Sequence, residues 1–166
     1  VCGAKEGDQE KSPIHIVSAW LNKNSLVLGQ VKTDEKSNEI TAIPELLDLL
    51  FLKGSTITID AMGTQKEIAR KIIKEKEADY VLALKMNQPT LYKDVEDYFQ
   101  FAIKENFKDI PYQFVRTSEK GHGRIETREY YLNTDISWLD GRKEWEGIKA
   151  VGMAVNRCIR KENVTE

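Results

Sequence analysis

Two runs of β-branched and other apolar residues open the regular part of the pattern. They cover residues 14–21 and 26–31, and the four polar residues between them make a connection of hairpin length. We therefore expect an antiparallel pair of strands. A helix is predicted next, capped by Thr41 and reaching Phe51, with Pro44 in its first turn and Gly54 as its stop.

The next apolar run is short and ends in an acid. Ile57 and Ile59 lie between turn residues, which predicts a buried strand with Asp60 at its carboxyl end. Ligands of α/β sheets bind at that edge, so the carboxylate is well placed to hold a metal ion. The alternative is that Asp60 only closes a turn, because Asp favours such positions for hydrogen bonding to the backbone.

A helix and a second strand complete a β-α-β unit. Thr64 and Glu67 have the spacing of a capping box, which predicts that they open an amphipathic helix. Residues 79–84 are a continuous apolar run, which predicts a parallel strand covered on both faces. Pro89-Thr90 then opens a longer helix that runs to about Asn106.

The last third of the chain has the alternation of an antiparallel hairpin. Residues 124–132 and 148–160 alternate with period two and predict paired strands, whereas residues 107–121 are less regular. Trp138 and Trp145 lie in the polar segment between the two strands. They would either stack on bases or close a small satellite core.

The order of elements indicates an α/β fold, a mixed sheet flanked by helices, built in the manner of a ribonuclease-H-like core. By comparison with such a core, we expect one antiparallel strand, the first, to be missing from the front. We expect a single partial domain over residues 1–166. It comprises a loop at 1–12, the core at 13–106, and an insertion at 107–166 that carries the appended β-hairpin.

Composition changes this picture little. The 166 residues are 40% hydrophobic and 31% charged, as in a soluble globular domain, and neither a membrane-spanning run nor a leader is apparent. Cys2 and Cys158 lack zinc-ligand spacing, which favours free thiols in the cytoplasm. The net charge of −2 means that any contact with DNA must come from a local basic patch.

Several blocks of the sequence resemble one family in consecutive residues and in family order. The blocks are residues 14–20, 28–44, 58–65, 79–85 with 87–89, and 121–128. They resemble the H-repeat-associated insertion-sequence transposases, a DDE family of bacteria. The resemblance covers nearly the whole chain.

The resemblance implies a ribonuclease-H-like domain that cleaves DNA and transfers strands during transposition. In such enzymes three carboxylates hold two Mg²⁺ or Mn²⁺ ions, which activate the nucleophile and stabilise the leaving oxygen. Asp60 falls on the second catalytic Asp of the family and would be the metal ligand. The first Asp, in an Asp-Gly-Lys motif, would precede Val1, and the catalytic Glu would follow Glu166, so the fragment alone would be inactive.

Glu126 is the rival for the third carboxylate, because it lies inside the block of residues 121–128. Its alternation with Arg124 and Arg128 equally suits one polar strand face held by cross-strand ion pairs. His122 joins these two arginines and Lys120 in a small basic cluster that would touch the phosphate backbone, although a solvated loop explains the cluster equally well.

Lys85, Asn87 and Gln88 follow the strand beside Asp60, where a substrate would lie. We expect them to contact DNA or to support the site; the alternative is a plain turn. By resemblance, the partners are transposon ends and further copies of the full-length protein, with no membrane. The competing functions are a catalytically dead remnant that binds DNA or a partner, and a small-molecule α/β enzyme, for which the sequence offers no cofactor loop.

Overall fold

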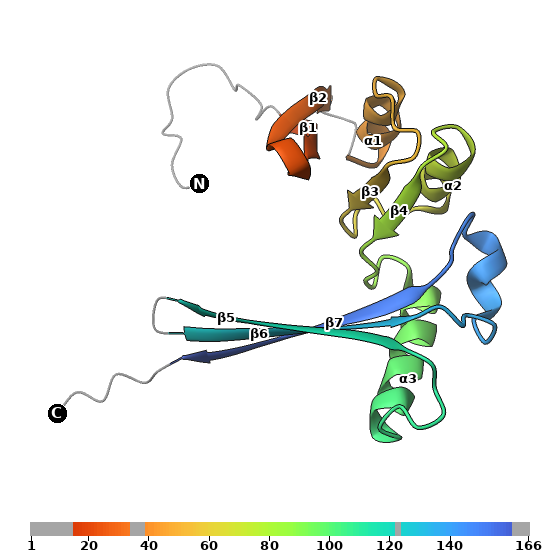
Figure 1. Ribbon diagram of the computed structural model, residues 1–166. Coiled ribbons are helices and arrows are strands. Elements are labelled where there is room, and N and C mark those ends of the chain that lie inside the picture. The colour runs from red at the N-terminus through yellow and green to blue at the C-terminus, as the bar shows by residue number, and fades with distance from the viewer. Residues whose placement is uncertain (1–14, 34–38, 122–123, 161–166) are drawn as a thin grey trace, which may run out of the picture. The chain divides into compact units, whose positions relative to one another are not determined.

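The computed structural model describes residues 15–33, 39–121 and 124–160 (Figure 1). These residues belong to two compact units, Val1–Ala83 and Leu84–Glu166, and each unit is described by itself. The predicted loop at residues 1–12 lies outside the described residues. None of the helices in the described ranges is long and apolar enough to cross a membrane.

The first unit begins with the predicted hairpin. Strand β1 (His15–Leu21) pairs antiparallel with β2 (Leu26–Thr33), and a bulge interrupts the register between Ala19 and Trp20. The short 3₁₀ helix η1 (Asn22–Asn24) and Ser25, which adopts a left-handed conformation with φ 50°, make the connection. The expectation of an antiparallel pair is therefore confirmed.

Helix α1 (Glu39–Asp48) packs against this hairpin. It lies over Gly29 so closely that a Cβ there would be 3.3 Å from Leu46 Cδ1. Both predicted ends of the helix were wrong. Thr41 lies within the helix, and the helix stops before Phe51, because the chain tightens after Asp48 into turns in which backbone N–H groups bond to carbonyls three residues earlier.

The β-α-β unit has the predicted order. Strands β3 (Thr56–Ile59) and β4 (Asp79–Leu82) are parallel, and α2 (Lys66–Lys74) connects them. The buried side chains of α2 face α1 and the strands in one apolar cluster. Its buried members are Leu47, Ile68, Ile72 and Ala78.

Two details of this unit differ from expectation. The residue that caps α2 is Gln65, not Thr64, because the Thr64 hydroxyl donates instead to the carbonyls of Ala83 (2.7 Å) and Asp60 (3.2 Å). The expected cover on both faces of β4 is also wrong, since Val81 is 58% exposed while the alternate residue Tyr80 packs on the cluster. Only the face toward the helices is covered in the described part of the unit.

The mixed α/β character is thus established, but the strands of the first unit form two separate two-stranded sheets among the described residues, β1-β2 and β3-β4. A single ribonuclease-H-like sheet that joins them stays a prediction.

The second unit consists of a helix and an antiparallel sheet. Helix α3 (Pro89–Lys104) begins at the predicted proline. Strands β5 (Gln113–Gly121), β6 (Arg124–Asn133) and β7 (Val151–Arg160) follow in the order β5-β6-β7. The predicted pairing of β6 with β7 is confirmed, but the appended hairpin is in fact a three-stranded sheet. Strand β5 was missed because all of its residues are exposed and its sequence lacks an apolar face.

A second apolar cluster joins α3 to the end of this sheet that contains Tyr131 and Val151. Its buried members are Val95, Phe99, Leu139 and Val151. The segment between β6 and β7, which contains the 3₁₀ helix η2 (Asp140–Glu144), closes the cluster. The Trp138 ring stacks on Tyr98 with centroids 4.1 Å apart, and Trp145 is buried. The two tryptophans therefore serve a satellite core and are not displayed for stacking on bases.

Candidate functional site

Asp60 lies at the carboxyl edge of the parallel β3-β4 pair. It follows Ile59, the last residue of β3, and the Ala83 N–H donates to the Ile59 carbonyl at 3.0 Å, so that the strands stay paired up to this point. The side chain of Asp60 is exposed. Its location agrees with the sequence analysis, and its role as a metal ligand stays a prediction.

The turn after Asp60 is held rigidly. The Met62 N–H donates to Asp60 Oδ1 at 3.2 Å, which is an Asx turn. The Thr64 hydroxyl ties the Asp60 and Ala83 carbonyls together from the other side of the turn. A Cβ on Gly63 would lie 2.3 Å from Ile59 Cγ2 and 2.6 Å from Ile43 Cδ1, so any larger residue there would displace these side chains. Asp60 therefore both closes a turn and presents its carboxylate to solvent in one orientation.

Asp60 is not part of a complete metal site within the described residues. No group of three or more His, Cys, Asp or Glu side chains in residues 15–33, 39–121 and 124–160 could hold a metal ion. A carboxylate oxygen is a suitable ligand for Mg²⁺, which takes oxygen ligands in octahedral geometry, but one such group is not sufficient. Any magnesium site would need ligands in addition to those described here.

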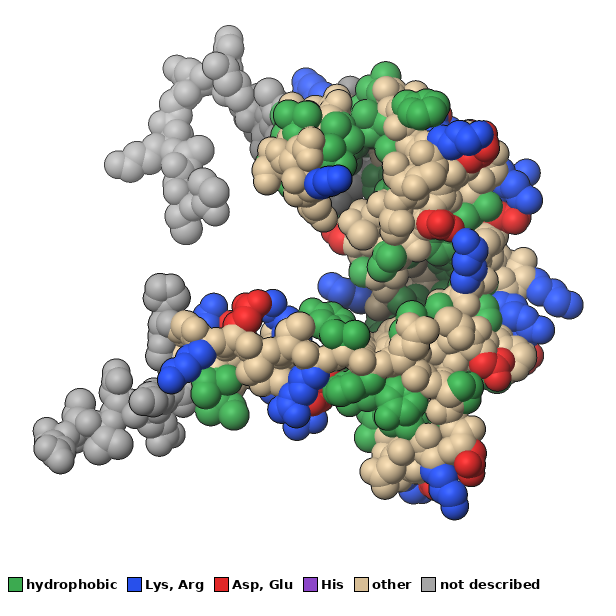
Figure 2. All heavy atoms as spheres, viewed as in Figure 1, with side chains coloured by type: hydrophobic (Ala, Val, Ile, Leu, Met, Phe, Trp, Pro, Cys, Tyr) green, Lys and Arg blue, Asp and Glu red, His purple; other side chains and the backbone are tan. Residues whose placement is uncertain are grey.

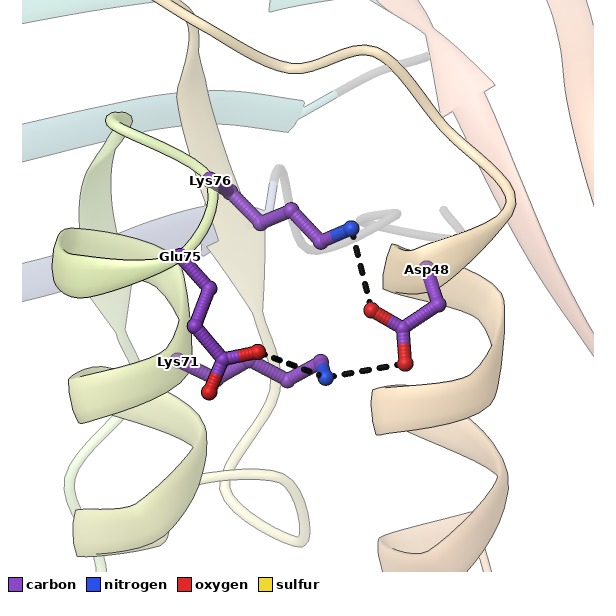
Figure 3. Close-up of polar contacts among 4 residues, drawn as sticks. All are labelled: Asp48, Lys71, Glu75 and Lys76. Carbon is purple, nitrogen blue, oxygen red and sulfur yellow. Dashed lines mark hydrogen bonds and ion pairs between the residues drawn. The ribbon is translucent and has the colours of Figure 1, made fainter.

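Figure 3 shows the ion pairs that join the two helices of the first unit. Asp48 on α1 accepts hydrogen bonds from Lys71 Nζ at 2.9 Å and Lys76 Nζ at 3.0 Å, and Lys71 also pairs with Glu75 at 3.0 Å. The hydrogen bond from Lys71, followed by that from Lys76, lowers the pKa of Asp48, and the bonds to Asp48 and Glu75 raise the pKa of Lys71. These contacts hold α1 against α2, and both helices pack on β3, the strand that precedes Asp60.

Glu126 is in β6, in the second unit, and both of its carboxylate oxygens are engaged. Oε1 is 2.8 Å from Arg124 Nε, and Oε2 is 2.9 Å from Arg128 Nη2. Arg128 also approaches Glu119 on β5 at 3.9 Å. A metal ion would have to displace two guanidinium groups, so the contacts favour the ion-pair interpretation. The pairs with Arg124 and Arg128 run along one strand, because residues two apart share a face, while the Glu119 contact crosses strands.

The other predicted site residues form a turn or lie outside the described residues. Lys85 and Asn87 are exposed, and the Gln88 N–H donates to the Lys85 carbonyl at 3.1 Å just before α3 begins. The turn is therefore present, and the contact of Lys85, Asn87 and Gln88 with DNA stays a prediction. His122 lies outside the described residues.

The sequence did not reveal a second acid, Glu129, that forms ion pairs with two arginines. Glu129 on β6 is only 12% exposed and lies 3.7 Å from Arg116 Nε and 3.6 Å from Arg157 Nη2. Strand alternation placed Glu129 on the face opposite Glu126, but its partner Arg116 is on β5. Recognising β5 as a strand would have revealed the cluster.

An α/β chain with an exposed Asp at the carboxyl edge of a parallel strand pair, followed by an antiparallel sheet, suits a DDE nuclease domain. Residues 2–142 match the family model described as "Transposase DDE domain". The chain belongs to this family, which confirms the resemblance found in the sequence.

Named relatives extend the match. The chain is 48% identical over 162 residues to "Putative transposase YncI" of Escherichia coli O157:H7, covering 97% of this chain and 40% of that protein. It is 54% identical over 131 residues to the protein of the same name in E. coli K12 (79% and 51% covered). It is 45% identical over 160 residues to "H repeat-associated putative transposase YhhI" of E. coli K12 (95% and 41% covered).

The chain thus spans about half of these relatives' length or less. No solved structure matches it.

Proposed function

We propose that this chain is part of the catalytic domain of an insertion-sequence transposase, which cleaves DNA and joins strands, and that Asp60 is one of its metal-binding carboxylates. The observation that carries the proposal is the exposed Asp60 carboxylate, fixed by the Met62 N–H at the edge of a parallel strand pair in a chain of the DDE family. Ligands bind at this edge in α/β sheets.

The residues of the chain would position this carboxylate. Met62 fixes one oxygen, while Gly63 and Thr64 hold the turn against Ile43 and the end of β4. Bound Mg²⁺ or Mn²⁺ would supply activation of the nucleophile and stabilisation of the leaving oxygen. By the family resemblance, the remaining two carboxylates are an Asp of an Asp-Gly-Lys strand before residue 1 and a Glu after residue 166.

The strand pairing supports a ribonuclease-H-like arrangement. Among the described residues, β1 pairs with β2 alone and β3 with β4 alone. A further strand between β1 and β3, antiparallel to the former and parallel to the latter, would join the two pairs into one mixed sheet. We propose that this strand carries the first catalytic Asp, which would bring it beside Asp60.

The proposed partners are transposon ends and other copies of the complete protein, in the bacterial cytoplasm. Lys85, Asn87 and Gln88 are proposed to contact DNA, together with cationic residues of the β5-β6-β7 sheet. The family membership and the exposure of Lys85 and Asn87 support these contacts.

The test is metal-dependent cleavage of DNA that carries the element's ends, by the complete protein that contains this chain. We expect Asp60→Asn to lower the cleavage rate by more than about 100-fold. Mutating even a residue that only hydrogen-bonds to a metal ligand lowers metal affinity or activity by about 10- to 100-fold. Asp109→Asn is the matched control at an exposed loop position. Equal activity of the Asp60→Asn protein and the wild type would refute the proposal.

A second candidate function is a DNA-binding or partner-binding module without catalysis. It is favoured by the lack of a complete metal-binding group within the described residues. Binding to duplex DNA that falls steeply with salt, yet is indifferent to Mg²⁺ and to Asp60→Asn, in a complete protein that never cleaves, would support this alternative.

A further inference from the structure

We propose that the two faces of the β5-β6-β7 sheet differ in function, and that the face bearing Glu129 is the one that binds the phosphate backbone of duplex DNA. The inference rests on the proposed function, since DNA is the substrate in both, and it identifies residues that no part of the preceding proposal names. Figure 2 shows Lys and Arg side chains along the sheet, interspersed with acidic and hydrophobic ones.

The strand register determines which side chains share a face, because directly paired residues of antiparallel strands project to the same side. Glu129 is paired with Arg116 and Val155, Thr127 with Ser118 and Arg157, and Ile125 with Lys120 and Ile159. These nine residues form the outer half of what we call the Glu129 face. Farther in, Tyr131 and Met153 of the same face pack on the apolar cluster of the unit, which leaves the outer half available.

The opposite side, the Glu126 face, carries Glu126 paired with Glu119 and Cys158, and Arg128 paired with Thr117 and Asn156, with Arg124 beyond them. Two arginines and two glutamates balance there among the described side chains, and Arg160 is the register partner of Arg124 at the end of β7. The Glu129 face carries the cations Arg116, Lys120 and Arg157 against a single Glu. This local excess of two positive charges stands out in a chain whose net charge is −2.

The ion pairs of the two faces also differ in strength. Arg124 and Arg128 lie within 2.9 Å of Glu126 and are 51% and 40% exposed. Arg116 and Arg157 lie 3.6–3.7 Å from Glu129 and are 61% and 70% exposed. Arg116 and Arg157 are therefore held less tightly than Arg124 and Arg128 and are more accessible to a phosphate group, while Glu129 itself is only 12% exposed.

The spacing of the two arginines suits a duplex. Arg116 and Arg157 are on the outer strands, offset by two positions along β6. Strand spacing and residue rise then place their Cα atoms about 12 Å apart. The major groove of B-DNA is also about 12 Å wide. Both guanidinium groups converge on Glu129 in the structure, and this Cα spacing would let them reach phosphates on both sides of the groove by turning outward from that carboxylate.

The first experiment measures binding of the purified chain to a labelled DNA duplex by fluorescence anisotropy across salt concentrations. We expect R116Q/R157Q to weaken binding by at least about tenfold at low salt, and to reduce the slope of log K against log salt by about 1.8, or about 0.9 for each phosphate that is no longer neutralised. The control R70Q/K93Q removes the same charge from two helix positions that are 69% and 71% exposed. It should leave the slope within about 0.5 of wild type.

A loss of binding could also result from misfolding of the variant. We therefore add substitutions that should strengthen binding. We expect Glu129→Gln to raise the affinity about threefold, because it removes a negative charge and releases Arg116 and Arg157. We expect Glu126→Gln to give a smaller gain, and R124Q/R128Q a smaller reduction of the slope than R116Q/R157Q. Circular dichroism melting curves check that each variant is folded.

Equal reductions of the slope from the two faces, or a Glu129→Gln variant that binds no better than wild type, would overturn the proposal. Competition by poly-glutamate as effective as that by DNA of equal charge would overturn it too, since the face would then suit an acidic protein. Failure of the wild-type chain to bind duplex DNA would also overturn the proposal. None of these results bears on Asp60-dependent cleavage by the complete protein, which tests the proposed function separately.

Discussion

Replacing Gly63 by Ala tests whether the turn beside Asp60 is as closely packed as the structure indicates. The new methyl group would lie 2.3 Å from Ile59 Cγ2 and 2.6 Å from Ile43 Cδ1, far inside van der Waals contact. The side chain of Ile59 on β3, that of Ile43 on α1, or both must shift to accommodate it. Overpacking of this kind costs about 1–3 kcal/mol. For a chain of this size such a cost lowers Tm by about 2–12 °C.

The assay is urea and thermal unfolding of G63A followed by circular dichroism, with G141A as the matched control. A Cβ at Gly141 would meet no atom within 4 Å, so that variant should unfold within about 0.5 kcal/mol of wild type. The double variant G63A/I43V removes one of the two clashing atoms. It should recover part of the stability, as residues in contact do not behave additively.

A G63A protein as stable as G141A would refute the packing argument, and with it the claim that the turn holds Asp60 in one orientation. In the complete protein, the same displacement should lower the rate of DNA cleavage. A G63A protein that loses stability but keeps full cleavage activity would show that the orientation of Asp60 does not depend on this contact.

Three further predictions concern stability. Tyr98→Phe should cost about 1–2 kcal/mol in urea unfolding, because it leaves the amide of the buried Asn133 without its bond to the tyrosine hydroxyl. Ile72→Ala should cost about 2–5 kcal/mol in the same assay, since Ile72 is fully buried in the first cluster. Asp48→Asn should lower Tm near pH 7 and have a progressively smaller effect as the pH falls below the unfolded pKa of this carboxyl group. The hydrogen bond from Lys71 lowers the pKa of Asp48 in the folded protein, so its stabilisation is present above the unfolded pKa of about 3.9 and disappears as the pH falls through the folded value. A Tm difference that persists unchanged to low pH would contradict this assignment.

The elements that the sequence predicted well are those whose apolar residues carry the signal. The hairpin and the β-α-β unit follow from β-branched runs between turn residues, and the same pattern located Asp60 at its edge. Strand β5 was missed because its alternation is between polar side chains on a fully exposed strand. The pattern of burial, and not strand formation itself, is what periodicity detects.

Long-range partners account for the other differences. Thr64 has the local spacing of a helix cap, but its hydroxyl bonds to Ala83, nineteen residues away, which no local pattern could indicate. The clamp on Glu126 follows from alternation within one strand, whereas the clamp on Glu129 requires residues from three strands. Sequence reasoning therefore found the first arginine pair and not the second.

The position of α1 has a consequence for how the first unit opens. This helix contacts both strands of the hairpin and also α2, whereas the two strand pairs do not bond to each other in the described residues. Two-stranded sheets are marginally stable without such packing. Opening of α1 would therefore uncouple the hairpin from the strand that carries Asp60, and we expect the amide protons of α1 and of the hairpin to exchange with solvent in the same opening event.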